Sequence, residues 1–429
     1  MRIKSRAGWL AAALAAAMAS SHPAQAQTAP AAEIGFTYEF HGTVQYDMAS
    51  YMQSASARAL PIGANLSDRG VWRRLWARVV GNMSHDWLYL FEVQGNTSGT
   101  IPVSIRQAYV EYDGWAPVAL RIGAYVGSTG MEGSTPVASA ILMERSSVST
   151  LQRSMGGGPL TGAALLYTGR DFYASLALGA GVLADTPLDW DRHSTFAARV
   201  ADVVYRDSDT AVAVAASSTG ILRVADSPPG SPTRRLQLNG NTELGVDATA
   251  LVSSGALNAE SAWSWALESA GTWRSFFAQA GYARFGVNRR QTLTDIGRNY
   301  QGFYLGASWI VTGERRRWSP GNGAFIGPAP SQPLDKGGLG AFEVAVRYSD
   351  LDFNDNPGQA GAAVPLGGSR GGDQRILGLG LNWSPTDQFR FMLQFQNVEI
   401  ERIGALGANP NADISQTYQS IALRSQFTF

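Results

Sequence analysis

The chain has 429 residues, of which 45% are hydrophobic and 16% charged, with 34 basic and 34 acidic side chains and a mean hydropathy of −0.10. This composition excludes a helical membrane protein, which needs apolar runs of about 20 residues, and a disordered chain, which is poorer in apolar and aromatic residues. The lack of cysteine excludes disulfide frameworks, thiolate metal sites and cysteine nucleophiles. The basic residues are almost all arginine, since Lys4 and Lys336 are the only lysines.

The first 26 residues have the pattern of a secretory signal peptide. Arg2, Lys4 and Arg6 precede an apolar stretch at 8–18, and the small residues around Ala24 and Ala26 form a cleavage site. The apolar stretch is too short to span a membrane. Cleavage after Ala26 would leave a domain at 27–429 with 31 basic and 34 acidic residues. This net negative charge argues against nucleic-acid binding.

The rest of the chain alternates between apolar and polar residues with a period of two, which is typical of half-buried strands. The clearest run spans 36–46, and similar runs recur at 74–79, 87–94, 120–126, 301–311, 342–349 and 389–396. Many runs exceed the usual strand length of about five or six residues and reach the length that crosses a bilayer at a tilt. Aromatic residues gather near their ends, as at a lipid interface. The pattern favours an all-β transmembrane antiparallel barrel, because a soluble sandwich accounts only for the alternation.

Short and long connections alternate along the chain. Tight turns are expected at 84–86, 113–116, 168–170, 206–209, 270–272 and 384–386, and Gly/Ser/Pro-rich loops at about 49–70, 96–103, 127–159, 183–193, 219–258, 288–298, 352–373 and 401–416. Short turns lie on the periplasmic side of such barrels and long loops outside. This rule assigns 243–252 to an external loop, although it reads as a strand, and predicts sixteen strands. The long segment 313–339 is then periplasmic, as an exception. The last strand ends at the aromatic Phe429.

An ordered set of short sequences resembles the phosphate-selective porin O and P family over about 34–429. They are AYVEY (108–112), LRIG (120–123), MERS (143–146), SWIVTGE (308–314), GAF (323–325), FEVAVRYS (342–349), LGLNW (379–383) and RFML (390–393). The resemblance implies a sixteen-stranded, trimeric barrel in the outer membrane of a Gram-negative bacterium, with a third loop that constricts the channel. It also implies passive uptake of anions such as phosphate, past arginines along the pore and lysines near the constriction. This chain lacks the lysines, because Lys336 lies in the predicted periplasmic segment.

The phase of the alternation places a set of arginines inside the barrel. Guanidinium groups stay charged at physiological pH and offer forked donors to phosphate or carboxylate oxygens. The predicted pore-lining, anion-binding residues are Arg74, Arg78, Arg121, Arg347, Arg390 and Arg424 on strands and Arg145 on the third loop, where Arg153 also lies. The same phase places Glu39, Asp47, Glu92, Glu111 and Glu343 inside, and the third loop adds Glu132 and Glu144. Two interpretations stay open: an anion-selective row, or ordinary charge pairs along a wet wall.

Two groups of arginines are expected outside the pore. Arg73 is out of phase with Arg74 and begins its strand at the outer rim, so it is expected to face a lipid headgroup. Arg315, Arg316 and Arg317 follow the predicted periplasmic turn, where they are expected to form a solvated interfacial cluster.

Other functions are weaker alternatives. One is a non-selective or cation-tolerant porin of the same fold. Another is a barrel enzyme or an adhesin, in which the loop at 219–258 would carry the function. His41 is the candidate base that faces the lumen, but no local motif supports a catalytic site. No catalytic residue, metal site or cofactor is therefore expected, and the predicted partners are small anions in transit, outer-membrane lipid and further copies of the chain.

Overall fold

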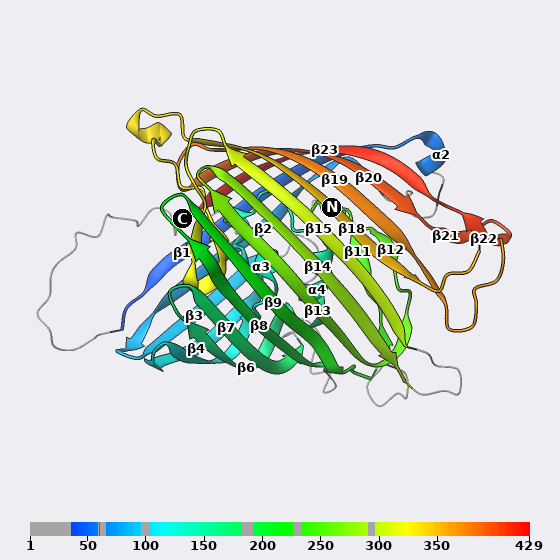
Figure 1. Ribbon diagram of the computed structural model, residues 1–429, viewed down its shortest axis with the longest axis horizontal. Helices are drawn as coiled ribbons and strands as arrows, with labels where there is room; N and C mark the ends of the chain where they lie inside the picture. Colours follow the sequence, from blue (N-terminus) through cyan, green and yellow to red (C-terminus); the bar gives the residue numbers. More distant parts are fainter. Residues whose placement is uncertain are drawn as a thin grey trace, which may run out of the picture. The chain divides into compact units, whose positions relative to one another are not determined.

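The computed structural model describes residues 36–58, 60, 66–95, 103–181, 192–226, 234–290, 297–359 and 361–429. The predicted signal peptide at 1–26 lies outside these residues. Sixteen antiparallel strands form a closed barrel, as predicted (Figure 1). They are β1 (Glu39–Met52), β2 (Arg69–Ser84), β3 (Trp87–Gly95), β4 (Val103–Trp115), β5 (Val118–Val126), β6 (Pro159–Thr168), β7 (Phe172–Gly181), β8 (Ser194–Arg206), β9 (Thr210–Arg223), β13 (Leu257–Trp273), β14 (Phe276–Arg289), β15 (Arg298–Ile310), β18 (Ala341–Asp355), β19 (Ser369–Ser384), β20 (Phe389–Glu401) and β23 (Gln416–Thr428).

The barrel closes between the first and last strands. Val44 of β1 pairs with Leu75 of β2 on one side and with Phe427 of β23 on the other. Closure removes every free strand edge, which a sheet in lipid requires because hydrocarbon cannot satisfy unpaired backbone groups. Among the described residues, no helix is long and apolar enough to cross a membrane.

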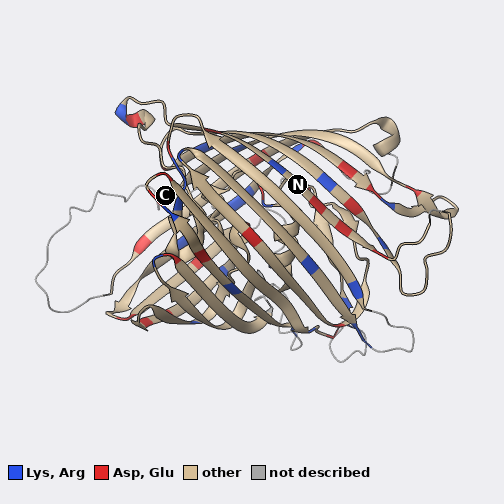
Figure 2. Ribbon diagram, viewed as in Figure 1, with Lys and Arg blue, Asp and Glu red and all other residues tan. Residues whose placement is uncertain are grey.

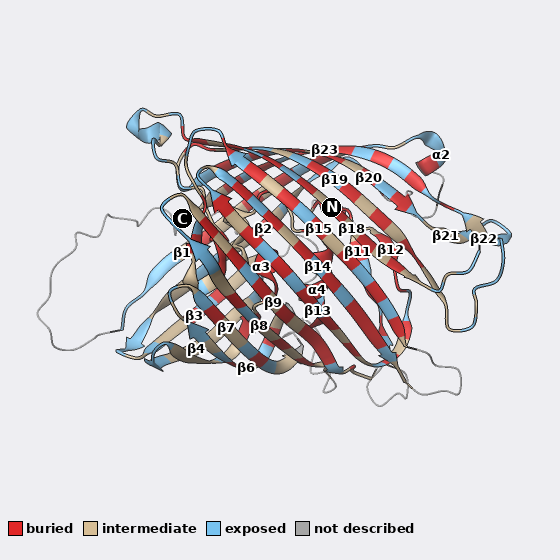
Figure 3. Cartoon of the chain, in the orientation of Figure 1, coloured by how far each residue is buried: buried red, intermediate tan, exposed pale blue. Residues whose placement is uncertain are grey.

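Side chains alternate between the two faces of the wall. Buried and exposed residues form regular bands along the strands (Figure 3), and the ribbon is uncharged over most of the strand lengths (Figure 2). In β23, Ser420 and Arg424 are buried while Ile421 and Leu423 are exposed. Leu305 and many similar residues are also exposed. The outward face is therefore apolar and suited to lipid, whereas the inward face is polar.

Aromatic rings gather at the strand ends near the short turns, as predicted. Trp273, Phe276 and Trp309 form one stack, with ring centroids 5.8 and 5.7 Å apart. Further pairs are Trp87–Tyr112, Tyr112–Trp115, Tyr167–Phe172 and Phe389–Phe427. Such a girdle marks the interface between hydrocarbon and headgroups.

The short connections lie at 85–86, 116–117, 169–171, 207–209, 274–275 and 385–388. The prediction of a turn at 270–272 was wrong, because these residues belong to β13, which continues to Trp273. The chain reverses at Arg274, which has a φ of 52°, and the flanking Trp273 and Phe276 stack across the turn. The alternation of short and long connections is otherwise preserved.

Three long connections contain helices or short strands that pack inside the barrel. The third loop, residues 127–158, contains α3 (Met131–Ser134), η1 (Val137–Ser139), α4 (Ser147–Gln152) and η2 (Arg153–Gly157). The β9–β13 connection contains β10 (Arg235–Leu236), β11 (Asn239–Asn241) and β12 (Ala250–Ser253), and the β15–β18 connection contains β16 (Arg317–Ser319), η3 (Pro320–Asn322), β17 (Ala324–Ile326) and η4 (Leu334–Lys336). Outer loops also carry α2 (Ala55–Arg58), β21 (Ile403–Leu406) and β22 (Asn409–Asp413).

All three connections pack into the barrel. Leu244 and Leu251 of the β9–β13 connection share a buried apolar cluster with Val148 and Leu151 of the third loop. Trp318 and Phe325 of the β15–β18 connection share another with Met131 and Leu142. The segment 243–252 is thus part of a long connection and not a barrel strand, as predicted. The long β15–β18 connection, which was the exception to the alternation, packs its β16–β17 hairpin against the third loop.

Candidate functional site

The third loop is fastened to the wall by buried ion pairs. Arg347 of β18, which is 2% exposed, donates to Glu132 Oε1 at 2.8 Å and to Glu243 Oε2 at 2.6 Å. It also donates to the backbone carbonyl of Glu144 at 2.8 Å. Glu132 belongs to the third loop and Glu243 to the β9–β13 connection. One wall arginine therefore holds both inserted segments.

Glu144 of the third loop forms a second fastening point. Arg424 of β23 donates to it at 2.6 Å and makes two 2.7 Å bonds to Asp47 of β1. Arg74 of β2 binds both oxygens of Glu144 at 2.9 and 2.8 Å. Arg73 does the same at 2.9 and 3.1 Å. A single carboxylate thus receives three guanidinium groups.

The expectation that Arg73 faces a headgroup was wrong. The register between β1 and β2 shifts at this point, because Gln45 pairs with Arg74 while Tyr46 pairs with Trp72. Arg73 is the extra residue of a β-bulge, which breaks the strict alternation of faces. Arg73 and Arg74 can therefore both reach Glu144 inside the barrel.

Further fastening points lie toward the periplasmic end. Glu343 of β18 accepts from Arg316 at 2.7 Å and from Arg390 of β20 at 3.3 Å. Both arginines also bind the third loop, Arg316 at the carbonyl of Ser139 and Arg390 at that of Ala138. Arg316 is 1% exposed. The prediction of a solvated cluster was therefore wrong for this residue, because its connection folds into the barrel.

Two fastening residues escaped the sequence reasoning although they occupy inward positions on their strands. Arg199 of β8 donates to the carbonyls of Asn322, at 3.0 Å, and Gly323. Glu268 of β13 accepts from the backbone N–H of Met131 at 2.7 Å and from the Tyr304 hydroxyl at 2.6 Å. Strand phase alone could have located both residues. Glu243 has no such signal, because it lies in a connection.

The third loop divides the lumen into two unequal parts. We call the inward faces of β8, β9, β13–β15, β18–β20 and β23 the filled half, because the inserted connections pack there. The open half is the inward face of β1–β7, where a cavity of about 630 Å³ remains between wall and third loop. Seven arginines and two glutamates line it: Arg73, Arg74, Arg78, Arg106, Arg121, Arg145, Arg153, Glu92 and Glu144.

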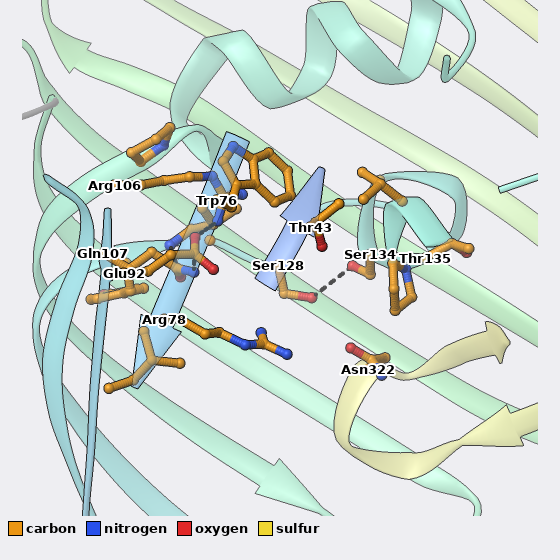
Figure 4. Close-up of a pocket in the computed structure, with 18 of the residues that line it drawn as sticks. Thr43, Trp76, Arg78, Glu92, Arg106, Gln107, Ser128, Ser134, Thr135 and Asn322 are labelled. Atoms are coloured by element: carbon orange, nitrogen blue, oxygen red, sulfur yellow. Dashed lines mark hydrogen bonds and ion pairs between the residues drawn. The ribbon is translucent and has the colours of Figure 1, made fainter. Parts of the chain in front are cut away.

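Three of these arginines have no carboxylate partner within the described part of the chain. Arg78 is exposed in the cavity and extends from β2 toward the third loop (Figure 4). Arg145 donates to the backbone carbonyls of Glu132 at 2.9 Å and Thr135 at 2.6 Å. Arg153 donates to the carbonyl of Gly133 at 3.4 Å. Hydrogen bonds to carbonyls hold Arg145 and Arg153 but pair neither guanidinium group with a carboxylate.

The other wall arginines are paired and lie on aromatic rings. Arg106 of β4 binds Glu92 and lies over the Trp76 ring at 3.9 Å (Figure 4). Arg121 of β5 binds Glu111 at 2.6 Å and lies over the Tyr109 ring at 4.3 Å. Sequence reasoning missed Arg106. The shift in the β3–β4 register between Glu92 and Val93 alters the phase there.

The structure thus separates the arginines that the sequence grouped together. Arg74, Arg78, Arg121 and Arg145 border the cavity. Arg347, Arg390 and Arg424 are buried beneath the third loop, with 2–3% exposure. Strand phase assigned these six strand arginines to the inside, but it contained no information about which of them the third loop covers.

His41 also borders the cavity, and its Nε2 lies 3.3 Å from Glu39 Oε2. Asp47, the other acid on its face, is bound to Arg424. Among the described residues, no group of three or more His, Asp or Glu side chains is arranged to hold a metal ion.

The sequence matches the family described as "Phosphate-selective porin O and P" over residues 39–429. It is 24% identical over 368 residues to Porin O of Pseudomonas aeruginosa, which covers 81% of this chain and 80% of that protein. A stretch of 118 residues, 28% of the chain, is 31% identical to an uncharacterized protein of Caulobacter vibrioides and covers 20% of its length.

Solved structures share the fold at low sequence identity. OmpT, an outer membrane protein of Vibrio cholerae, aligns with a TM-score of 0.54 at 9% identity, over 93% of this chain and 99% of that one. The outer membrane channel DcaP of Acinetobacter baumannii aligns with a TM-score of 0.52 at 11% identity, over 93% and 99%.

Proposed function

The chain belongs to the phosphate-selective porin O and P family, and on that premise we propose that its open half conducts small anions, phosphate among them, in preference to cations. Family membership makes the protein an outer-membrane channel and not a barrel enzyme. The inner surface of a channel selects ions by its width and by the charges on its wall.

The main support for this proposal is the excess of positive charge around the cavity. Seven arginines border it against two glutamates. Arg78, Arg145 and Arg153 lack carboxylate partners among the described residues. Low-dielectric walls focus the field of such charges, which raises the local concentration of ions of opposite sign. A cation entering this space meets repulsion, whereas an anion meets N–H donors from the wall and from the third loop.

Arginine alone supplies this positive field. Lys336 lies in η4 on the periplasmic connection and does not border the cavity. A lysine-containing constriction therefore has no counterpart in the cavity, and the proposal covers small anions as a class.

We further propose that residues 1–26 direct export and are cleaved, and that the barrel assembles as a homotrimer, as the family resemblance implies. N-terminal sequencing of protein extracted from outer membranes tests the first point. Cross-linking followed by electrophoresis without heating tests the second.

The reversal potential across a planar bilayer in a KCl gradient tests the anion preference. We expect the wild-type channel to favour chloride, and the Arg78→Glu variant to lose most of that preference because it reverses an uncompensated charge in the cavity. Arg170→Glu is the matched control, since Arg170 is 84% exposed in a turn outside the cavity. A wild-type potential that favours potassium would contradict the proposal, and equal permeability would indicate a non-selective porin.

A further inference from the structure

The cavity wall is apolar between its arginines. Rings and aliphatic side chains fill the spaces: Trp76, Tyr109, Tyr125, Tyr173, Leu90 and Leu166. Trp76, Tyr109 and Leu166 are partly exposed, whereas Leu90, Tyr125 and Tyr173 are at most 7% exposed, so the apolar surface that a solute meets is mainly that of the first three. Apolar side chains offer no hydrogen bonds to a small hydrated ion, so this surface does not assist its passage.

Cation and ring are adjacent at two places. The Arg106 guanidinium lies 3.9 Å from the centroid of the Trp76 ring. The Arg121 guanidinium lies 4.3 Å from Tyr109 and 5.8 Å from Tyr125. The rings limit the orientations of the guanidinium groups by stacking. A solute beside the wall therefore meets positive charge and an apolar face within a few ångströms.

The third loop places further cations opposite this surface. Arg145 and Arg153 belong to the loop, whereas Arg78, Trp76 and Tyr109 belong to the wall. Figure 4 shows Arg78 extending from the wall toward Ser128 of the third loop and Asn322 of the β15–β18 connection. An anionic group between the two sides can therefore be held by guanidinium donors while its apolar body lies against the rings.

Inorganic phosphate fits only half of this environment. It gains hydrogen bonds from arginine, but the apolar stretches cannot replace its hydration, and desolvating a charge without new partners is costly. A planar organic anion fits both halves, because its carboxylate meets arginine and its ring meets Trp76 and Tyr109. The cavity of about 630 Å³ also lies within the range of roughly 300–1,000 Å³ that is typical of small-molecule sites.

We propose that the channel takes small planar organic carboxylates in preference to inorganic phosphate, with Trp76 and Tyr109 as the residues that distinguish the two. This inference rests on the proposed anion preference and narrows its solute class. Arg78, Arg145 and Arg153 bind the carboxylate in transit, and the two rings contact the planar body.

Block of chloride current through single channels tests the inference, with benzoate, acetate and phosphate as probes at equal ionic strength. We expect benzoate to block at a concentration about tenfold lower than acetate or phosphate, which is the order of the gain in affinity from one contact between aromatic rings. Trp76→Leu and Tyr109→Leu keep apolar volume but remove the rings, so they should raise the blocking concentration of benzoate and leave that of acetate unchanged. Trp265→Leu is the control, because Trp265 is 36% exposed on the outward face.

The outcomes separate the two proposals. If benzoate, acetate and phosphate block equally while the reversal potential favours anions, the solute class is wrong and the anion preference stands. If benzoate blocks strongly but both ring variants keep that block, the assignment of selection to Trp76 and Tyr109 is wrong, because the two rings then do not distinguish the solutes. A reversal potential that favours cations overturns the anion preference, and this inference with it.

Discussion

The filled and open halves of the lumen use the same residue type for different purposes. In the filled half, Arg347 and Arg390 meet carboxylates and are buried under the third loop. In the open half, Arg78 and Arg153 border free space without a carboxylate partner among the described residues. The wall arginines of both halves occupy inward-facing positions on their strands. Whether a guanidinium group fastens a loop or creates a field is therefore decided by the acids that reach it.

Glu144 lies at the border between the halves. It binds Arg424 from one side and Arg73 and Arg74 from the other, while it also borders the cavity. Its position joins the third loop to the closing strands of the barrel. A change at this border should therefore affect both loop position and ion permeation.

The largest effect is expected from Arg347→Met. The substitution leaves Glu132 and Glu243 buried without their arginine, and breaking a buried pair in this way costs about 3–5 kcal/mol. The third loop should loosen, which urea unfolding of the refolded barrel and increased noise in single-channel current will detect. Arg317→Met is the control, because Arg317 is exposed on the periplasmic connection.

A rescue variant separates charge from packing. Adding Glu132→Gln and Glu243→Gln to Arg347→Met removes the unpaired charges, so part of the lost stability should return, as expected for coupled neighbours. No recovery would mean that Arg347 acts through packing.

Cysteine accessibility should distinguish the halves directly, because the native chain has no cysteine. Ser134 borders the cavity, whereas Ser147, in α4 of the same loop, is 4% exposed and donates to Glu243. An anionic methanethiosulfonate should modify the Ser134→Cys variant about tenfold or more faster than a cationic one, because the arginines concentrate anions. The Ser147→Cys variant should resist both reagents. Rapid modification of both variants would contradict the division of the lumen.

Arg153→Gln should weaken the anion preference several-fold at low salt without loosening the loop. Its guanidinium group donates one long hydrogen bond, of 3.4 Å, to the Gly133 carbonyl. Arg153 should therefore affect the channel mainly through its positive charge and not by holding the loop. The difference from wild type should shrink at 1 M salt, where the screening length falls to about 3 Å. Reversal potentials at two salt concentrations measure this, and an effect independent of salt would point to a change in pore width.

Arg274→Ala should have the smallest effect. Arg274 lies in the β13–β14 turn, 67% exposed, and its Nε is 3.3 Å from Asp209. Exposed ion pairs contribute about 1 kcal/mol or less. Thermal unfolding should therefore change little, and conductance should match wild type. A large loss would show that this turn has a structural role beyond its ion pair.

The barrel, its sixteen strands, the alternation of short and long connections and most inward positions follow from the sequence alone. These features are local, because a strand repeats every two residues and a turn is specified by a few neighbours. The same reasoning failed at Arg73, where one extra residue in a bulge disturbs the phase. It also failed at Arg316, where a connection folds back into the lumen.

Which arginines are neutralised depends on contacts that form only in the folded barrel. Arg424 binds Asp47 across 377 positions of the chain, and Arg347 binds Glu132 across 215. No local sequence pattern predicts these ion pairs, because they depend on the positions of the three inserted connections inside the closed barrel. The excess of arginine over lysine is visible in the sequence. Its division into a fastening set and a field-forming set is a property of the fold.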